Sequence, residues 1–206
     1  MNQFNEKQIE ILLVAEKLFA EEGFDGTSIR DIAKIANINI AMISYYFGSK
    51  DKLLESLILY RISGMSLRLE SLYQENIPPI EKIEKLIVYY IENISTNRLI
   101  YQILHIELSN KKREINLDAF KEVKNNNLKL LQNIIKEGQD LGLFQPDINV
   151  PLIPPVIIGS FIHFLKNKMY YQELLELKND TDFETYIKTD LTPHIQKTVK
   201  ALLTHH

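Results

Sequence analysis

The sequence contains no cysteine, which excludes disulfide scaffolds, thiolate nucleophiles and thiolate metal sites. It also has no run of about 18 uninterrupted apolar residues, the length that a membrane-spanning helix requires. The first residues, MNQFNEKQIEILLV, do not place a basic segment before a continuous apolar one, as a secretory signal does. We therefore expect no membrane partner and, by elimination, a cytoplasmic location.

Signatures of catalysis and of metal binding are missing as well. The chain has no glycine-rich phosphate loop and no nucleophile elbow. His105 and Glu107 form the H-x-E pair of zinc deaminases, but that chemistry also needs downstream cysteines. His194, His205 and His206 show no metal-ligand spacing. We predict that the protein is not an enzyme and holds neither a metal nor a cofactor.

Glycine and proline are scarce, with seven of each in 206 residues, and they fall where apolar periodicity breaks. The contents of hydrophobic residues, 45%, and of charged residues, 25%, are those of a folded globular protein. This pattern predicts an all-α fold in which glycine and proline mark the helix ends.

The first 48 residues predict three helices. Ile11, Leu12, Ala15, Leu18 and Phe19 share one face of a helix that ends near Glu22, before Gly23. A second helix starts after Thr27 or Ser28 and ends at Asn37. A third, residues 40–47, follows a three-residue turn with Asn39 as its N-cap. The spacing of the second and third helices is that of a helix-turn-helix.

The third helix carries no charge, and its two faces differ. On a helical wheel Ile43 and Phe47 point inward with Tyr46 beside them, whereas Ala41, Ser44 and Tyr45 point outward. An outward face of small and aromatic residues can enter a major groove and contact thymine methyl groups. Ile40 and Met42 lie on its margins, and Asn39 can bond to an adenine edge or a phosphate.

Lys50 stands at the start of the next helix, where a cation is unfavourable for the helix dipole. Such a placement indicates an anionic partner, for example DNA phosphate. Thr27 occupies the matching position at the start of the second helix.

The stretch TSIRDIAKIANINIAMISYYFGSKDKLL, preceded by AEKLFAEEGFDG, resembles the DNA-binding segment of TetR-family (tetracycline-repressor-like) transcriptional regulators. The ordered match covers about the first quarter of the chain. The rest resembles the family in length, in helical rhythm and in the GxxxGxF of Gly138, Gly142 and Phe144. The resemblance implies base contacts and phosphate contacts; the former are Asn39, Ile40, Ala41, Met42, Ser44 and Tyr45, and the latter Thr27, Tyr46 and Lys50. The chain departs from the family where Asn37 replaces a common glycine and Ile40 a common lysine or arginine.

The family resemblance also implies a helix-turn-helix domain at residues 1–48 and a larger helical ligand-binding and dimerisation domain at 49–206. Residues 1–56 hold six lysine or arginine residues against nine acids. We therefore expect weak nonspecific binding and a preference for half-sites that contain A·T pairs.

In the second part of the chain we predict a helix that starts at Pro78 and Pro79, reaches about Ile94 and continues over 99–108 after a break near Asn97. We also predict helices at about 117–140 and 154–177, a polar loop at 109–114, and a last helix that Pro193 either kinks or opens. Aromatic residues at helical spacing suggest an apolar cavity, although most of them can equally fill the core. The candidate ligand residues are Tyr90, Tyr101, His105, Phe120, Phe161, His163 and Phe164.

One recognition helix reads too few base pairs for specificity, so we expect a homodimer on double-stranded DNA with half-sites about 34 Å apart. Apolar stripes on the last two long helices predict a four-helix interface, unless these stripes pack internally. The stripes consist of Ile157, Ile158, Phe161, Leu165, Ile195, Val199 and Leu202.

The function predicted from these observations is that of a ligand-responsive regulator, with an unknown small apolar or amphipathic effector that releases a palindromic operator. Two alternatives remain at this point. An all-helical carrier or enzyme would use the aromatic cavity without sequence-specific DNA binding, and an interaction module would use residues 40–47 on a protein partner.

Overall fold

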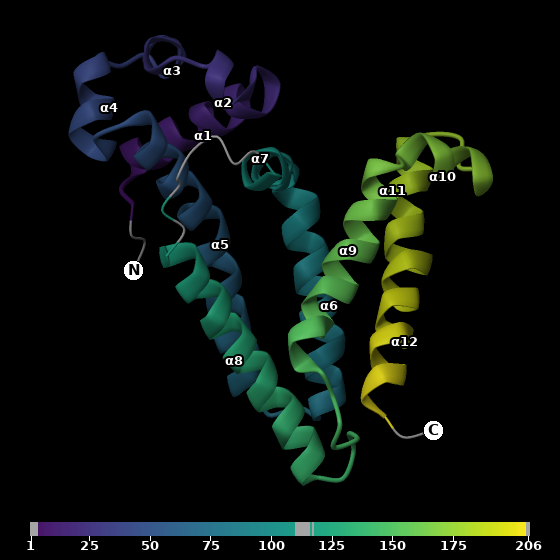
Figure 1. Cartoon of the computed structure of the whole chain (residues 1–206). Helices are drawn as coiled ribbons and strands as arrows, with labels where there is room; N and C mark the ends of the chain where they lie inside the picture. The colour runs from purple at the N-terminus through teal and green to yellow at the C-terminus, as the bar shows by residue number, and fades with distance from the viewer. Residues whose placement is uncertain (1–3, 110–115, 117, 205–206) are drawn as a thin grey trace. The chain divides into compact units, whose positions relative to one another are not determined.

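The computed structural model describes residues 4–109, 116 and 118–204, and these residues form helices and no strand (Figure 1). The predicted all-α class is confirmed. The chain divides into two compact units. The first unit comprises Met1–Ser66 and Thr96–Lys124, and the second comprises Leu67–Ser95 and Asn125–His206. The predicted boundary at residue 48 falls inside the first unit, between its fourth and fifth helices.

The first unit opens with α1 (Glu6–Glu21) and the short α2 (Gly23–Gly26). Asn5 caps α1 because its side-chain oxygen accepts a hydrogen bond from the Gln8 N–H at 2.9 Å. Gly23 has φ +76°, the left-handed conformation predicted for the end of the first helix. The first helix does not simply end before a loop, because Gly23 is also the first residue of the one-turn helix α2.

The predicted helix-turn-helix is α3 (Ile29–Ile35) and α4 (Ile40–Phe47). Ser28 caps α3 in a capping box with Asp31, and Asn39 caps α4. Asn37 adopts φ +51° in the turn. The predicted caps Ser28 and Asn39 and the predicted turn between the two helices are therefore confirmed.

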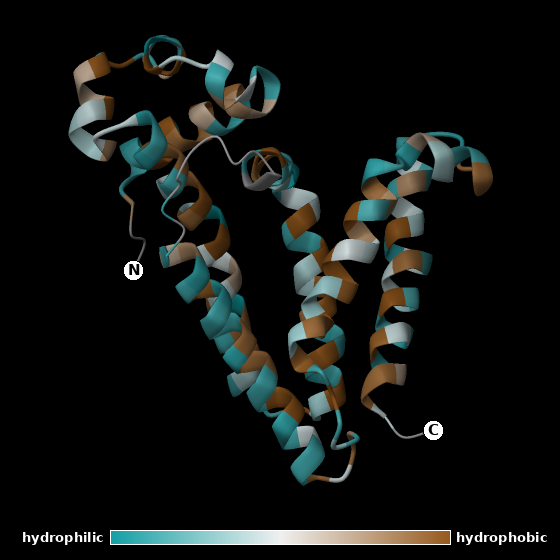
Figure 2. Ribbon diagram, in the orientation of Figure 1, coloured by the Kyte–Doolittle hydropathy of each residue, from teal (hydrophilic) through white to brown (hydrophobic). Residues whose placement is uncertain are grey.

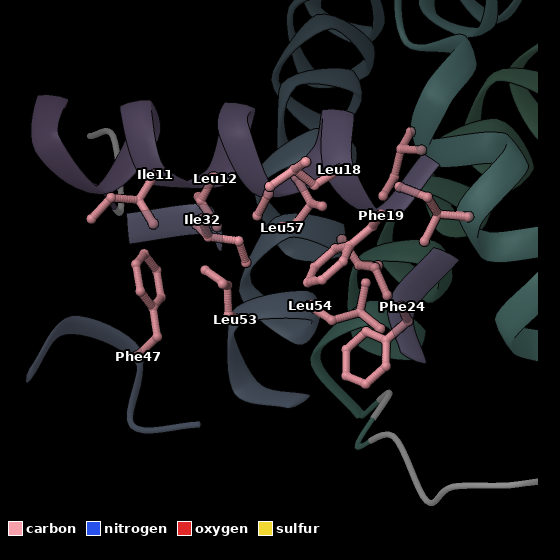
Figure 3. Close-up of a cluster of buried hydrophobic side chains, with 14 of the residues drawn as sticks. Ile11, Leu12, Leu18, Phe19, Phe24, Ile32, Phe47, Leu53, Leu54 and Leu57 are labelled. Carbon is pink, nitrogen blue, oxygen red and sulfur yellow. The ribbon is translucent and has the colours of Figure 1, made fainter. Parts of the chain in front are cut away.

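One hydrophobic core holds the first unit together (Figure 3). It joins α1, α2, α3 and α4 to α5 (Lys50–Gln74) and α7 (Arg98–Ser109). Phe19 and Phe24 pack with their ring centroids 5.1 Å apart. Leu53, Leu54 and Leu57 of α5 are fully buried against these helices. The packing of α5 therefore holds the helix-turn-helix in place.

The second unit is built from the remaining parts of α5 and α8 (Asp118–Asp140) together with α6 (Pro79–Thr96) and the C-terminal helices. These are the 3₁₀ turn Val150–Leu152, α9 (Ile153–Lys166), α10 (Lys168–Leu174), α11 (Asp180–Tyr186), a π-helical turn (Ile187–Leu191) and α12 (Thr192–Leu203). Hydrophobic and hydrophilic residues alternate along these helices, as expected where each buries one face (Figure 2).

Three predictions for this part of the chain need comment. The expected single helix at 154–177 is wrong, because the chain bends by 80° between α9 and α10. The predicted loop at 109–114 lies outside the described residues except for Ser109, which ends α7. Pro193 lies in the first turn of α12, after the π-helical turn, and the Thr192 hydroxyl donates to the Ile187 carbonyl at 2.7 Å.

No single helix of the described chain has both the length and the hydropathy of a membrane span. Residues 150–174 pass that test only as two helices with the bend between them.

Candidate nucleic-acid interface

The two faces of α4 are placed as the helical wheel predicted. Ile43 is 0% exposed and Phe47 is 6% exposed, and both belong to the core of the first unit. On the opposite face Ala41 and Ser44 are exposed, and Tyr45 is 83% exposed. Burial of the inner face by α1, α3 and α5 leaves the uncharged outer face available to a groove.

The margins of this face are also accessible. Ile40 is 43% exposed, and Met42 is half-buried. Tyr46 is half-buried, with its ring edge-on to Tyr45 at 5.2 Å. Asn39 is exposed, and its side-chain oxygen accepts a hydrogen bond from the Ala41 N–H at 2.8 Å, so this oxygen serves as the cap.

Lys50 has partners within the protein. Its ammonium donates to the backbone carbonyls of Phe24 at 2.8 Å and Thr27 at 2.9 Å, and it lies 4.3 Å from the centroid of the Phe24 ring. These carbonyls lie at the end of α2, where a cation is favourable for the helix dipole. The position of Lys50 at the start of α5 is therefore explained without an anionic partner, which corrects the inference drawn from the sequence.

Thr27 is only 1% exposed, and its hydroxyl donates to the Gly23 carbonyl at 2.8 Å. The structure therefore does not present this side chain for the phosphate contact that the resemblance implied. Thr27 follows the last residue of α2, and its hydrogen bond to Gly23 stabilises the end of that helix.

Three cations that were not among the predicted contacts are exposed on the helix-turn-helix and the start of α5: Arg30, Lys34 and Lys52. Burial of Ile32 and Ala33 turns Arg30 and Lys34 of α3 outward. The same helical periodicity that located the core of α3 could have identified them.

The only acid of α3, Asp31, lies in the first turn and forms the capping box with Ser28. It accepts hydrogen bonds from the hydroxyl and the N–H of Ser28, and these bonds lower the pKa of Asp31 below its ordinary value of 3.8. The carboxylate therefore stays ionised at neutral pH and stabilises the start of α3.

The predicted ligand residues divide between the two units. Tyr101 and Phe120 are half-buried against the core of the first unit, and His105 of the same unit is exposed. A cavity of about 210 Å³ in this unit includes Phe120. Its lining is Glu55, Ser56, Ile58, Leu59, Asn116, Asp118, Ala119 and Phe120.

In the second unit Tyr90 is half-buried, and Phe161 and Phe164 are buried in the core. The Phe164 ring stacks on Phe183 with the centroids 4.9 Å apart and the planes at 16°. This supports the core-filling alternative for Phe161 and Phe164. His163, like His105, is exposed.

The predicted dimer residues also separate into two groups. Ile157, Phe161, Ile195 and Val199 are at most 2% exposed within one chain, where α9 contacts α12. A residue enclosed by its own chain cannot also meet a second copy, so internal packing, the alternative considered above, accounts for these four. Ile158 and Leu165 are half-buried and Leu202 is 44% exposed, which leaves them accessible.

Among the described residues, no group of three or more histidine, aspartate or glutamate side chains is arranged to hold a metal ion.

Two family models match the chain. The model described as bacterial regulatory proteins, tetR family, matches residues 11–57. The model described as YsiA-like protein, C-terminal region, matches residues 64–183, which is more than half of the chain.

Known relatives extend these matches. The probable HTH-type transcriptional regulator YttP of Bacillus subtilis is 31% identical over 188 residues, covering 80% of this chain and 88% of that protein. The HTH-type transcriptional repressor NicS of Pseudomonas putida is 31% identical over 147 residues, covering 67% of this chain and 66% of the repressor, just under two thirds of its length.

The structure of the transcriptional regulator FadR from Bacillus subtilis, in complex with stearoyl-CoA, has the same fold, with a TM-score of 0.71 at 20% identity. The likeness covers 92% of this chain and 95% of FadR.

Proposed function

Because the chain belongs to the TetR family of bacterial transcriptional regulators, we propose that it is a repressor that binds a palindromic operator as a homodimer and is released by a small effector. The single observation that carries the DNA-binding part is the exposed, uncharged outer face of α4. The buried side chains Ile43 and Phe47 hold this face in place.

The chemistry of α4 determines which bases it reads. Arginine and lysine, the side chains that best recognise guanine, are absent from α4. Ile40, Ala41 and Tyr45 instead offer apolar groups to thymine methyls, and the amide group of Asn39 can reach an adenine edge. We therefore propose that the centre of each half-site contains A·T pairs.

Phosphate contacts position the protein and carry no sequence information. Arg30, Lys34 and Lys52 are exposed around α4, and Tyr46 and Lys50 remain proposed contacts from the sequence. Lys50 already donates two hydrogen bonds inside the unit, so at most its third ammonium hydrogen is left for a phosphate.

Support for the homodimer comes from α9. No residue from Ile153 to Leu165 is charged, and Pro155, Gly159, Ser160 and His163 lie on the surface of the single chain. A helix surface without charge is typical of protein interfaces. We propose that this outer face of α9, with Ile158 and Leu165 beside it and Leu202 of α12, meets its symmetry mate. Sedimentation at low protein concentration tests this, and a persistent monomer would reject it.

The proposed effector is apolar or amphipathic. FadR, which shares the fold, was solved with stearoyl-CoA, an amphipathic molecule. Stearoyl-CoA is therefore a suitable first probe. A true effector lowers the affinity for the operator, and the operator lowers the affinity for the effector by the same factor.

The DNA-binding proposal is tested by selecting binding sites from random double-stranded DNA and comparing two tyrosine variants. Tyr45→Ala removes the most exposed large hydrophobic side chain of α4 and is expected to weaken binding to the selected operator about tenfold, or about 1.4 kcal/mol. Tyr170→Ala removes a tyrosine of 60% exposure on α10 and is expected to leave binding unchanged.

Selected half-sites with guanine contacts alone at their centres would contradict the proposed readout. Failure to enrich any sequence would instead favour a carrier, an enzyme or a protein-interaction module.

A further inference from the structure

The outer face of α4 has little capacity for base-specific hydrogen bonds. Between Lys34 and Lys50 the sequence contains no charged residue. The amide of Asn39 stands at the start of α4, and its oxygen already accepts the hydrogen bond that caps the helix, from the Ala41 N–H at 2.8 Å. Paired hydrogen bonds between asparagine and adenine use both this oxygen and the amide N–H groups. Asn39 therefore keeps its N–H groups for a base, while its oxygen serves the helix.

The hydroxyl groups on this face do not distinguish the two pyrimidines. Ser44 and Tyr45 are exposed, and a hydroxyl group both donates and accepts hydrogen bonds. It can therefore bond to the O4 acceptor of thymine or to the N4 donor of cytosine. Selection between these bases has to come from another property of the face.

The side chains at the centre of the outer face are apolar or aromatic. Ala41 and Tyr45 are four residues apart and so lie one above the other on the helix. Tyr45 is 83% exposed and Ile40, in the first turn, is 43% exposed, whereas Phe47 on the opposite face points into the core (Figure 3). Removing such a surface from water is favourable where it meets an apolar group of the DNA.

The C5 methyl group of thymine is the apolar group that unmodified bases present in the major groove. 5-Methylcytosine carries a methyl group on the same ring atom, next to an amino group instead of a carbonyl. The hydroxyls of Ser44 and Tyr45 accommodate that exchange, because they can accept from the amino group. Burying one methyl group against α4 is worth about fourfold in affinity, whichever pyrimidine carries it.

We propose that α4 recognises the C5 methyl group of a pyrimidine, and that 5-methylcytosine therefore takes the place of thymine in the operator. The recognised chemical class is C5-methylated pyrimidine, whether the methyl group belongs to thymine or was added to cytosine by a DNA methyltransferase. Binding to a site that contains cytosine at these positions then depends on its methylation. This inference deepens the proposed function and rests on it, because it takes α4 as the surface that reads the operator.

The test uses the full-length protein and the operator obtained from the random-DNA selection. Each thymine at the centre of a half-site is replaced in turn by deoxyuridine, which lacks only the methyl group. For a contacted thymine the affinity is expected to fall about fourfold when one half-site is altered and about fifteenfold when both are. Replacing that T·A pair in both half-sites by a pair of 5-methylcytosine with guanine is expected to give about fifteenfold tighter binding than replacing it by C·G. Deoxyuridine outside both half-sites is expected to leave the affinity unchanged.

Three variants test whether α4 makes the methyl contact. Ile40→Ala/Tyr45→Ala removes both large apolar side chains from the outer face and is expected to reduce the preference for thymine over uracil to at most about threefold. Tyr45→Phe removes only the hydroxyl group and is expected to keep the full preference. Tyr170→Ala, which removes an exposed tyrosine of α10, is the matched control and is expected to keep it as well.

The salt dependence separates the methyl contact from the phosphate contacts. The affinity itself falls steeply with salt, because phosphate contacts release counterions. An apolar contact releases none, so the ratio of affinities for thymine and uracil is expected to be the same at about 50 mM and about 200 mM salt.

Equal affinity for thymine and uracil at every central position, or for 5-methylcytosine and cytosine, would overturn the inference and leave the proposed function standing. An undiminished thymine preference in Ile40→Ala/Tyr45→Ala would overturn it in the same way. If the selection yields no operator, the proposed function fails and this inference fails with it.

Discussion

Gly138→Ala is expected to destabilise the protein, although alanine is the better helix former. Gly138 is buried near the end of α8, and Phe144 is 2% exposed. A Cβ on Gly138 would lie 2.2, 2.4 and 2.7 Å from three carbons of the Phe144 ring. Ordinary carbon contacts are about 3.5–4.0 Å, so the ring would have to move by more than about 1 Å.

The backbone of the turn opposes that movement. The N–H groups of Leu143 and Phe144 both donate to the Gly138 carbonyl, at 2.8 and 3.1 Å, and Gly142 adopts φ +69° between them and the helix. Overpacking costs typically about 1–3 kcal/mol, and the overlap here indicates the upper end. After an offset of about 1 kcal/mol for helix propensity, we expect a net loss of about 2 kcal/mol. This corresponds to a lower Tm by about 4–8 °C for a chain of this size.

Thermal and urea unfolding at fixed protein concentration measure the loss. Gly64→Ala is the control, because its Cβ would meet no atom within 4 Å, and it should stabilise by about 1 kcal/mol. In a Phe144→Ala background the clash is absent, so Gly138→Ala should there be neutral or stabilising. An unchanged or increased stability of Gly138→Ala in the wild-type background would refute the reasoning.

Two further predictions concern the first unit and its link to α5. Arg61→Met should destabilise by about 3 kcal/mol in urea unfolding, because Glu16, 3% exposed, would be left as an unpaired buried carboxylate. Arg68→Met breaks an exposed pair and should cost at most about 1 kcal/mol, and equal losses would refute the distinction. Because the hydrogen bonds of Ser28 lower the pKa of Asp31 below 3.8, its stabilisation is present above that value and is lost as the pH falls through the lower folded pKa. Asp31→Asn should therefore be less stable than the wild type at neutral pH and equal to it in acid, and a difference that persists in acid would contradict this.

The parts of the structure that follow from local sequence could be predicted. Capping by Ser28 and Asn39, the turn at Asn37 and the burial of Ile43 and Phe47 depend on residues within four positions of one another. Hydrogen-bonding groups and periodicity decide such features before any tertiary contact forms.

Long-range contacts explain where the predictions failed. Lys50 finds its partners 26 and 23 residues earlier in the chain, and no local pattern indicates them. The stripes on α9 and α12 show a similar limit. Periodicity indicates that Ile157 and Val199 are buried, but it does not indicate what buries them. A helix of the same chain and a second copy of the chain would produce the same pattern in the sequence.

The π-helical turn at Ile187–Leu191 has a consequence for how α12 tolerates changes in length. Buried residues on both sides of this turn are spaced by multiples of four: Phe183, Ile187, Ile195, Val199 and Leu203. An α-helix advances about 100° per residue, so a spacing of four drifts about 40° at each step and about 200° between the first and the last of these residues. The wide turn of the π-helix contains one residue more than an α-helical turn, which reduces this drift by about 100°. The buried residues therefore stay on one side of the helix. Deleting one residue there would make the helix regular and leave Ile195 and Val199 on the buried face, because the wide turn already takes back the rotation of that residue. Deleting one residue from the regular part of α12 would instead rotate every later residue by about 100°, away from the core, so this helix tolerates a change in length at the wide turn and not beyond it.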